Sequence, residues 1–267
     1  MKGGCEGAKG VMLPSFAAML RNLLLGAGFW LCLASFTADK PLADGRTLAT
    51  LWYATSAEAQ ACYLQGYAQA EARLMALGRS NGRQVIVTDL DETAVNNAAS
   101  TALDIAEGKS YSPERWDAWE RKGLATALPG AVPFFKLADA LGYRICYLSN
   151  RSVPFTAATL RNLQALGLPQ ADSAHLSLKT STSNKEPRRA ALRAQGYEIV
   201  MLLGDNLADF VEVPADATEA QRAELVEQHR AEWGRRFIVF PNPMYGGWQP
   251  KPDAASARIN QLAQPAR

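Results

Sequence analysis

The chain of 267 residues is 48% hydrophobic and 20% charged, which suits one globular domain, or one domain with a modest insertion, and excludes a disordered or fibrous protein. Its 28 Lys and Arg residues nearly balance its 26 Asp and Glu residues, for a net charge of +2. The sequence has no basic stripe interleaved with aromatic residues, so we expect no nucleic-acid partner.

The N-terminal segment contains an uncharged run from Leu23 to Phe36. A run of this length matches the apolar region of a signal peptide and is too short to span a bilayer comfortably. Small residues allow cleavage after Ala34 or after Ala38. We therefore predict that residues 1–38 are a signal peptide and that residues 39–267 form a single mature domain. An uncleaved membrane anchor is the alternative.

The first predicted helix follows a polar linker near residues 39–46. The segment Thr55-Ser-Ala-Glu58 matches a capping box, which predicts a long helix that ends near Leu77, before Gly78. Cys62 falls in this helix and Cys146 in a later apolar strand, so two buried free thiols are favoured over a disulfide.

A strand and an irregular helical segment come next. The β-branched run QVIVT, residues 84–88, predicts a buried strand. Residues 96–128 have an irregular helical pattern in which Ser112 is the expected N-cap and Pro113 begins the first turn. We expect this segment to form a small, mainly helical cap.

The remainder alternates between helical and apolar strand patterns. After Gly130 come the helix FFKLADALG, a strand at 144–150, a helix at about 154–166, a strand at 175–179, a helix after 184, a strand at 199–206, a helix at about 219–233 and a strand at 236–240. Apolar strands that alternate with helices are typical of a parallel sheet covered on both faces. We predict an α/β core of about residues 80–95 and 129–245, with helical additions at about 55–79 and 96–128.

Polar clusters lie at the carboxyl ends of three of these strands, after Thr88, Leu148 and Leu203, and one more opens a helix. They comprise Asp89 and Asp91, Ser149 and Asn150, Lys185, and Asp205 and Asp209. In a parallel sheet the carboxyl ends of the strands meet at one edge, where ligands bind. Taken alone, the Asp-x-Asp pair would suit a solvated loop and the lysine a surface position, but their places at element ends favour a common site.

The residue types in these clusters suit phosphoryl chemistry. Of two nearby carboxylates, one can act as a nucleophile and the other as an acid. A phosphoryl group needs hydrogen-bond donors and positive charge, which Ser149 and Lys185 can supply. Four carboxylates in one cleft require a hard cation, and a set of oxygen ligands selects Mg²⁺ over Zn²⁺.

The ordered motifs DLDET, LSNR, SNKEP and GDNLADF resemble those of the haloacid dehalogenase superfamily. Together with SAEAQA, PGAVPFF and PNPMYGGW, they resemble its class C acid phosphatases, which are bacterial exported 5′-nucleotidases and often lipoproteins. The resemblance covers roughly residues 52–248. It implies a Rossmann-like haloacid dehalogenase core with a small helical cap, and an Mg²⁺-dependent hydrolase of phosphomonoesters such as nucleoside 5′-monophosphates.

The resemblance also implies roles for individual residues. Asp89 would attack phosphorus to form an aspartyl-phosphate, and Asp91 would protonate the leaving oxygen and later activate water. The ligands of Mg²⁺ would be Asp89, the backbone carbonyl of Asp91 and Asp205, with Asp209 acting through water. Ser149 and Lys185 would bind the phosphoryl oxygens, with Asn150 beside them.

The resemblance further implies a base-binding clamp formed by Tyr111 and Tyr245, with Asn97 as a polar neighbour. The alternative is that both tyrosines pack under loops.

One departure from the family concerns its lipidated cysteine, which follows a small residue, whereas Cys32 follows Leu31. This departure argues against a lipid anchor and favours a periplasmic or secreted protein. A homodimer stays open.

Two other functions remain open on the same core: a phosphotransferase that passes the phosphoryl group to an alcohol, and a catalytically silent exported binding protein. Other phosphatase chemistries fit less well. A thiol phosphatase loop needs Cys and Arg six positions apart, but Cys146 and Arg151 are five apart. His175 and His229 are the only histidines, too few for a dinuclear metallophosphatase.

Overall fold

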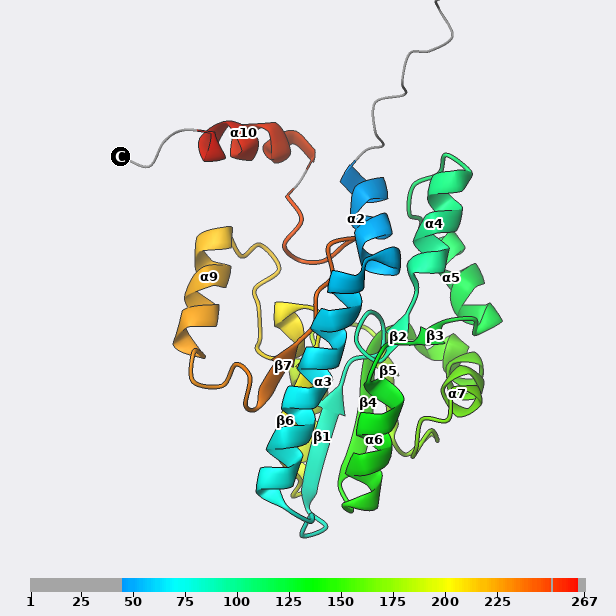
Figure 1. Cartoon of the computed structure of the whole chain (residues 1–267), viewed down its shortest axis with the longest axis vertical. Helices are drawn as coiled ribbons and strands as arrows, with labels where there is room; N and C mark the ends of the chain where they lie inside the picture. The colour runs from blue at the N-terminus through cyan, green and yellow to red at the C-terminus, as the bar shows by residue number, and fades with distance from the viewer. Residues whose placement is uncertain (1–44, 251, 264–267) are drawn as a thin grey trace, which may run out of the picture. The chain divides into compact units, whose positions relative to one another are not determined.

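The computed structural model describes residues 45–250 and 252–263, which belong to one unit spanning residues 44–267 (Figure 1). The predicted signal peptide, residues 1–38, and Cys32 lie outside the described residues. Within the described ranges, no helix is both long enough and apolar enough to cross a bilayer.

A five-stranded parallel sheet forms the centre of this unit, as the sequence predicts. Its strand order is β5 (Leu176–Lys179), β4 (Arg144–Ser152), β1 (Gln84–Thr88), β6 (Glu198–Gly204) and β7 (Phe237–Val239). The register pairs Val87 of β1 with Cys146 of β4 and with Leu202 of β6. The first strand of the chain, β1, is therefore the central strand of the sheet. The strands β4 and β5 are added on one side of it, and β6 and β7 on the other.

Helices cover both faces of the sheet (Figure 1). The helices of the described residues are α2 (Gly45–Thr55), α3 (Ala57–Leu77), α4 (Ala98–Ala106), α5 (Pro113–Lys122), α6 (Ala131–Ala140), α7 (Thr156–Ala165), α8 (Glu186–Ala194), α9 (Glu219–Gln228) and α10 (Pro252–Leu262), with 3-10 turns η1 (Val153–Phe155) and η2 (Leu207–Asp209).

The alternation of side chains along β1 separates two hydrophobic cores. Ile86 faces the larger core, where it packs with Leu74 of α3 and Phe135 of α6. Val85 and Val87 face the other side and pack with residues of α8 and η2. Every side chain from Val85 to Thr88 is buried, which explains why this strand reads as a continuous apolar run.

The start of α3 differs from the prediction. Ser56 is its N-cap, and the Ser56 hydroxyl accepts a hydrogen bond from the backbone N–H of Ala59 at 3.0 Å. Thr55 is instead the last residue of α2, so the capping box from Thr55 to Glu58 was wrong. The helix α2 was not predicted, because a single polar residue separates it from α3.

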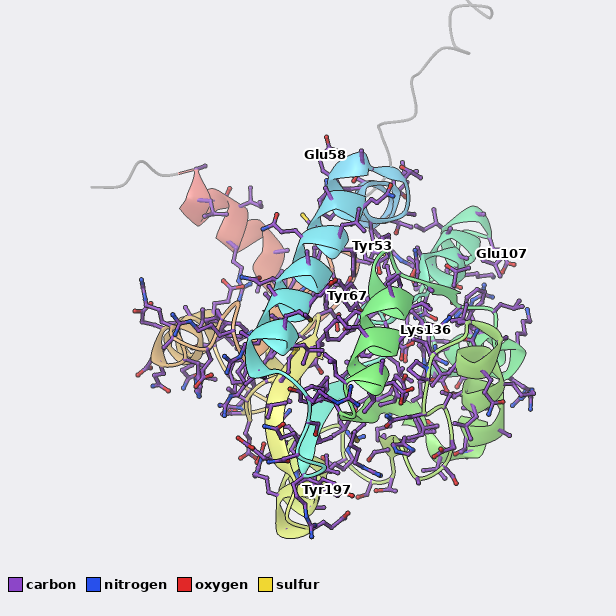
Figure 2. All side chains as sticks on the ribbon, turned by 60° about the horizontal axis from the view of Figure 1, so that its bottom comes forward. Tyr53, Glu58, Tyr67, Glu107, Lys136 and Tyr197 are labelled. Carbon is purple, nitrogen blue, oxygen red and sulfur yellow. The ribbon has the colours of Figure 1, made fainter. Side chains whose placement is uncertain are left out.

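Three tyrosines from these helices, Tyr53, Tyr63 and Tyr67, are buried in the protein. Figure 2 shows Tyr53 of α2 and Tyr67 of α3 on the inner side, whereas Glu58 points outward. The Tyr63 hydroxyl donates to the backbone oxygen of Glu92 at 2.7 Å, and that of Tyr67 donates to the backbone oxygen of Thr93 at 2.8 Å. These bonds attach α3 to the turn that follows β1.

The inserted segment is framed by a short antiparallel pair, β2 (Val95–Asn96) with β3 (Thr126–Ala127). Strands of two residues carry no readable periodicity, so they were not predicted. The N-cap at Ser112 and the first-turn Pro113 are confirmed. Cys146 is buried and free as expected, but the expectation that Cys62 is buried was wrong, because it lies on the exposed side of α3.

Candidate active site

The Asp-x-Asp motif lies in a tight turn at the end of β1. The backbone N–H of Asp89 donates to the carbonyl oxygen of Leu203 in β6 at 2.9 Å, so the sheet fixes this residue. The N–H groups of Ala94 and Val95 both return to the carbonyl oxygen of Leu90, at 2.9 and 2.8 Å. This turn directs Asp89 and Asp91 toward the same cavity.

Glu92 occupies a strained position in this turn. Its φ of 58° lies in the left-handed region, which costs free energy for a residue other than glycine. The side chain is fully buried and accepts hydrogen bonds from the backbone N–H of Asn97, at 2.7 Å, and from the hydroxyl of Tyr245. Burial raises the pKa of Glu92 well above its ordinary value, and the neighbouring Asp91 adds to the rise.

Three carboxylates gather beside this turn. One oxygen from each of Asp89, Asp205 and Asp209 lies within 4.8 Å of the others. Asp209 accepts hydrogen bonds from the backbone N–H groups of Asn206, at 2.9 Å, and Asp205, at 3.2 Å. This close approach requires a glycine, since a Cβ on Gly204 would lie 2.3 Å from the Asp209 Cβ.

A buried lysine completes the cluster. The Lys185 ammonium contacts Asp89 and lies 2.7 Å from an oxygen of Asp209, with 5% of its side chain exposed. Burial lowers the pKa of Lys185, but the two carboxylates more than offset this effect and the pKa is raised. Burial raises the pKa of Asp89 to about 7; Lys185 opposes this rise, and Asp209 and Asp91 reinforce it.

The donor set of this cluster fits a hard divalent cation. Asp89, Asp205 and Asp209 offer only oxygen atoms, and the Lys185 ammonium contacts two of the three carboxylates, Asp89 and Asp209. Burial raises the pKa of Asp205 well above its ordinary value, with contributions from Asp209 and Asp89. A cation of charge +2 placed among the three would favour their ionised forms, and oxygen ligands suit Mg²⁺.

The helix α8 connects the lysine to the carboxylate loop. One turn after Lys185, the buried Arg189 donates through Nη1 to the backbone oxygens of Asp209, at 2.7 Å, and Ala208, at 3.1 Å. Its Nε donates to Glu186 at 2.8 Å. One rigid element therefore positions both the ammonium and the backbone of η2.

The Asp91 carboxylate turns away from the cluster and binds Arg151. Arg151 Nη2 and Nε lie 2.7 and 3.0 Å from Asp91 Oδ1. The Asn97 side-chain Nδ2 donates to the same oxygen at 2.8 Å, and the Ser149 hydroxyl donates to Oδ2 at 3.3 Å. The side chain of Asp91 therefore does not belong to the carboxylate cluster, and any metal contact from this residue would have to come from its backbone.

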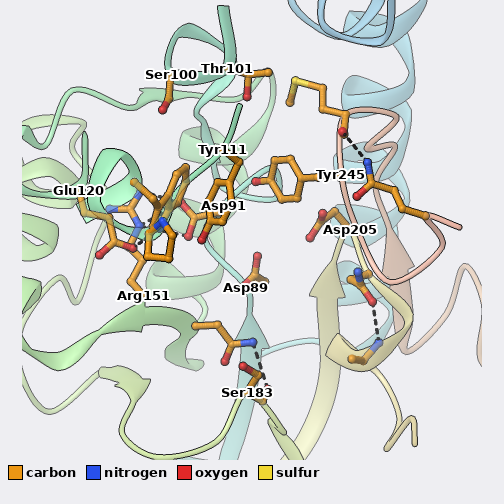
Figure 3. A pocket seen from close by; sticks show the side chains of 18 of the residues that line it. Asp89, Asp91, Ser100, Thr101, Tyr111, Glu120, Arg151, Ser183, Asp205 and Tyr245 are labelled. Atoms are coloured by element: carbon orange, nitrogen blue, oxygen red, sulfur yellow. Dashed lines mark hydrogen bonds and ion pairs between the residues drawn. The ribbon is translucent and has the colours of Figure 1, made fainter. Parts of the chain in front are cut away.

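A cavity of about 1080 Å³ opens over these groups. Figure 3 shows Glu120 and Arg151 on one side of it, Asp205 on the other and Asp89 between them. The predicted site residues that line it are Asp89, Asp91, Tyr111, Asn150, Lys185, Asp205, Asp209 and Tyr245. The structure therefore brings most of the predicted set together, across segments far apart in the chain.

Two predicted residues do not line the cavity. Ser149 is fully buried, and its hydroxyl faces Asp91 and the backbone N–H of Arg151. Asn97 is 1% exposed and supports Asp91 from behind, so the expectation that it neighbours a bound base does not fit this geometry. Of the two tyrosines, Tyr111 is 64% exposed, whereas Tyr245 is half-buried and bonded to Glu92.

Three site residues were missed by sequence reasoning. Arg151 directly follows the predicted Ser149-Asn150 pair, yet an arginine after a strand gives no sign of its partner. Trp116 and Glu120 lie on α5 one turn apart, and the indole N–H of Trp116 donates to Glu120 Oε1 at 2.5 Å. Burial raises the pKa of Glu120 to about 7, and nearby Asp91 adds to the rise. Helical spacing alone does not reveal that this face lines a cavity.

These features together place the chain among the haloacid dehalogenase-type α/β proteins that its motifs resemble. Comparison with family models narrows the assignment: residues 43–248 match the HAD superfamily, subfamily IIIB (acid phosphatase), and the chain belongs to this family. The predicted parallel core is thereby confirmed as a fold of this superfamily.

Similar proteins come from bacteria and plants. A crystal structure of the class C acid phosphatase from Bacillus anthracis with tungstate bound has a TM-score of 0.74 and 37% identity, covering 85% of this chain and 99% of that chain. The stem 31 kDa glycoprotein of Glycine max is 29% identical over 173 residues, and acid phosphatase 1 of Solanum lycopersicum is 28% identical over 172. The match spans about three fifths of the length of these plant relatives, 61% and 60%.

Proposed function

We propose that this protein is an Mg²⁺-dependent phosphomonoesterase that hydrolyses nucleoside 5′-monophosphates through an aspartyl-phosphate on Asp89. The observation that carries the proposal is the position of Asp89, which lines the cavity, contacts the Lys185 ammonium and has a carboxylate oxygen within 4.8 Å of those of Asp205 and Asp209. Asp91, two residues on, faces the same cavity but belongs to a separate network. The two carboxylates thus have different surroundings, as a nucleophile and an acid require.

In the first step, an oxygen of Asp89 attacks phosphorus and the bond from phosphorus to the ester oxygen breaks. Asp91 gives its proton to that departing oxygen, so an alcohol leaves. In the second step, Asp91 takes a proton from water, whose oxygen attacks phosphorus and breaks its bond to Asp89. Inorganic phosphate leaves and Asp91 is protonated again. Lys185 offsets the negative charge on the phosphoryl oxygens throughout.

Asp89, Asp205 and the backbone carbonyl of Asp91 would hold Mg²⁺, with Asp209 acting through water. The ion would stabilise the negative charge on the phosphoryl group and reduce repulsion between it and the carboxylates. The tungstate bound to the Bacillus anthracis relative supports an oxyanion site in this fold, because tungstate is a tetrahedral oxyanion like phosphate.

The outer cavity supports a substrate with an aromatic group. Tyr111 and Tyr245 both line it, as does Trp116. Figure 3 shows the Tyr111 and Tyr245 rings at the cavity. A base placed between such rings would gain stacking energy that a small aliphatic ester lacks. Ser149 would act on the phosphoryl group indirectly, through Asp91 and Arg151, and Asn150 would contact it from the cavity wall.

For the protein as a whole we propose export, with residues 1–38 removed as a signal peptide and no lipid anchor at Cys32. The mature N-terminus in the native host, measured by mass spectrometry, tests this proposal. A cytoplasmic species that retains Met1, or a diacylglyceryl adduct on Cys32, would contradict its two parts separately.

The test of the activity is a phosphate-release screen over nucleoside 5′-monophosphates, sugar phosphates and p-nitrophenyl phosphate, with Mg²⁺ and with excess EDTA. We expect release with Mg²⁺ and none with EDTA, and none from Asp89→Asn. Transfer of phosphate to added glycerol in place of release would favour a phosphotransferase. No turnover on any ester under either condition would favour a catalytically silent protein.

A further inference from the structure

A hydrogen-bonded chain leads from the helix α5 to Asp91. The indole N–H of Trp119 donates to the side-chain oxygen Oδ1 of Asn97 at 2.8 Å, and Nδ2 of Asn97 donates to Asp91 Oδ1 at 2.8 Å. An indole nitrogen can only donate, so it can face only the oxygen of the Asn97 amide. Trp119, with a longer contact of 3.4 Å from Arg151 Nη2 to the same oxygen, thereby fixes the amide with its NH₂ group directed at Asp91.

The two oxygens of Asp91 consequently have different surroundings. Oδ1 accepts from Arg151 Nη2 at 2.7 Å, from Arg151 Nε at 3.0 Å and from Asn97 at 2.8 Å. Oδ2 has longer contacts, 3.2 Å to Arg151 Nε and 3.3 Å to the Ser149 hydroxyl. A proton on Oδ1 would point at three donors at close range, whereas a proton on Oδ2 would meet only the two longer contacts, one of them to a hydroxyl that can also accept.

We propose that Trp119 is a positioning residue for the proton transfer: through Asn97 it saturates Asp91 Oδ1, so that the transferable proton resides on Oδ2. The inference rests on the proposed function, in which Asp91 protonates the leaving oxygen. Trp119 itself does not line the cavity, but its neighbours Trp116 and Glu120 on α5 do. The helix that forms part of the cavity wall therefore also orients the acid.

The test uses two esters with different need for an acid. The alkoxide released from glycerol 2-phosphate is strongly basic and must be protonated as it departs, whereas p-nitrophenolate leaves readily without a proton. In Trp119→Phe, which keeps a ring but loses the N–H, we expect kcat/KM for glycerol 2-phosphate to fall by about three- to tenfold, the usual effect of one hydrogen bond. The value for p-nitrophenyl phosphate should change less than about twofold, since kcat/KM reports only the steps through departure of the leaving group.

Matched variants separate this role from a structural one. Trp233→Phe also removes an indole N–H hydrogen bond, to the backbone oxygen of Val226 at 2.9 Å, and Trp233 is partly buried against the core that contains Val85 and Val87. It should affect both esters equally and little. Asn97→Leu, of similar shape but without the amide, should repeat the selective loss of Trp119→Phe. Thermal unfolding of each variant establishes that the compared proteins are folded.

The effect of Asp91→Asn on the two esters shows whether a negative result contradicts only the positioning role of Trp119 or also the proposed role of Asp91 as the acid. If Asp91→Asn selectively loses activity on glycerol 2-phosphate but Trp119→Phe and Asn97→Leu do not, the positioning role is overturned and the proposed function stands. If Asp91→Asn affects both esters equally, Asp91 is not the acid, and the mechanism and this inference fail together. An equal loss on both esters in Trp119→Phe would assign Trp119 to the stability of the fold.

Discussion

Replacing Lys185 by methionine should destabilise the metal-free protein strongly. Methionine keeps most of the apolar length of the side chain but removes the ammonium that contacts Asp89 and lies 2.7 Å from Asp209. Both carboxylates are more than nine-tenths buried, and Asp205 stands beside them. Removing one partner of a buried ion pair typically costs about 3–5 kcal/mol, because the remaining charge stays buried without compensation.

For a domain of this size, each kcal/mol shifts the unfolding midpoint by roughly 2–4 °C, so we expect Lys185→Met to unfold about 6–20 °C below the wild type. The assay is thermal unfolding followed by circular dichroism, near neutral pH and in excess EDTA. Lys136→Met is the matched control, because Lys136 lies on the exposed side of α6. Its midpoint should stay close to that of the wild type.

Addition of Mg²⁺ gives this prediction a second readout. A ligand that binds only the folded state stabilises it according to its concentration and affinity. The Lys185 ammonium occupies the same group of carboxylates that would bind the cation and repels it. Saturating Mg²⁺ should therefore raise the midpoint of Lys185→Met by more than it raises that of the wild type. An unchanged midpoint in EDTA, or a smaller Mg²⁺ shift in the variant, would refute the reasoning.

Three further predictions concern the site. Asp89→Asn should abolish turnover, whereas Asp91→Asn should lower it by about 10²–10⁴-fold and accumulate phosphoenzyme, detectable by mass spectrometry; equal residual activities would contradict the division of roles. Asp205→Asn should weaken Mg²⁺ binding in calorimetry, and wild-type affinity would exclude Asp205 as a ligand. Tyr111→Ala and Tyr245→Ala should each lower kcat/KM for a nucleotide by about three- to tenfold but barely change it for glycerol 2-phosphate, and equal losses would mean that they support the fold.

The strands of the core could be predicted because a strand buried on both faces has a continuous run of apolar residues in the sequence. The run at residues 85–87 is apolar throughout, since both faces of the strand pack against helices, and β1 has the predicted bounds of residues 84–88. The first residue of α3 was harder to predict, because Thr55 and Ser56 can both act as the N-cap of a helix. The choice depends on α2, whose last turn includes a hydrogen bond from the Thr55 hydroxyl to the backbone oxygen of Leu51. The helix α2 also packs through its buried Tyr53 against Tyr63 of α3, and such tertiary packing is not revealed by propensity.

The same limit applies to the site. Asp89, Asp91, Asp205 and Asp209 could be located because the ends of parallel strands meet at one edge of the sheet. The partner of Asp91 could not, because Arg151 reaches it across the site from another strand. Asn97 illustrates the difference: its position in the chain suggested a contact with substrate, but its 1% exposure and its hydrogen bonds assign it to the support of Asp91.

Part of the cavity wall could be replaced by the corresponding segment of another family member without changing the hydrogen bonds that reach Asp91. Ser100, Thr101 and Tyr111 all belong to residues 98–118, which line its outer part. This stretch ends just before Trp119, whose hydrogen bond to Asn97 reaches Asp91. A chimera that takes residues 98–118 from another family member would therefore acquire a new outer cavity wall and keep the hydrogen bonds from Trp119 to Asn97 and from Asn97 to Asp91. A graft extended by one residue would place both properties under the control of the foreign segment.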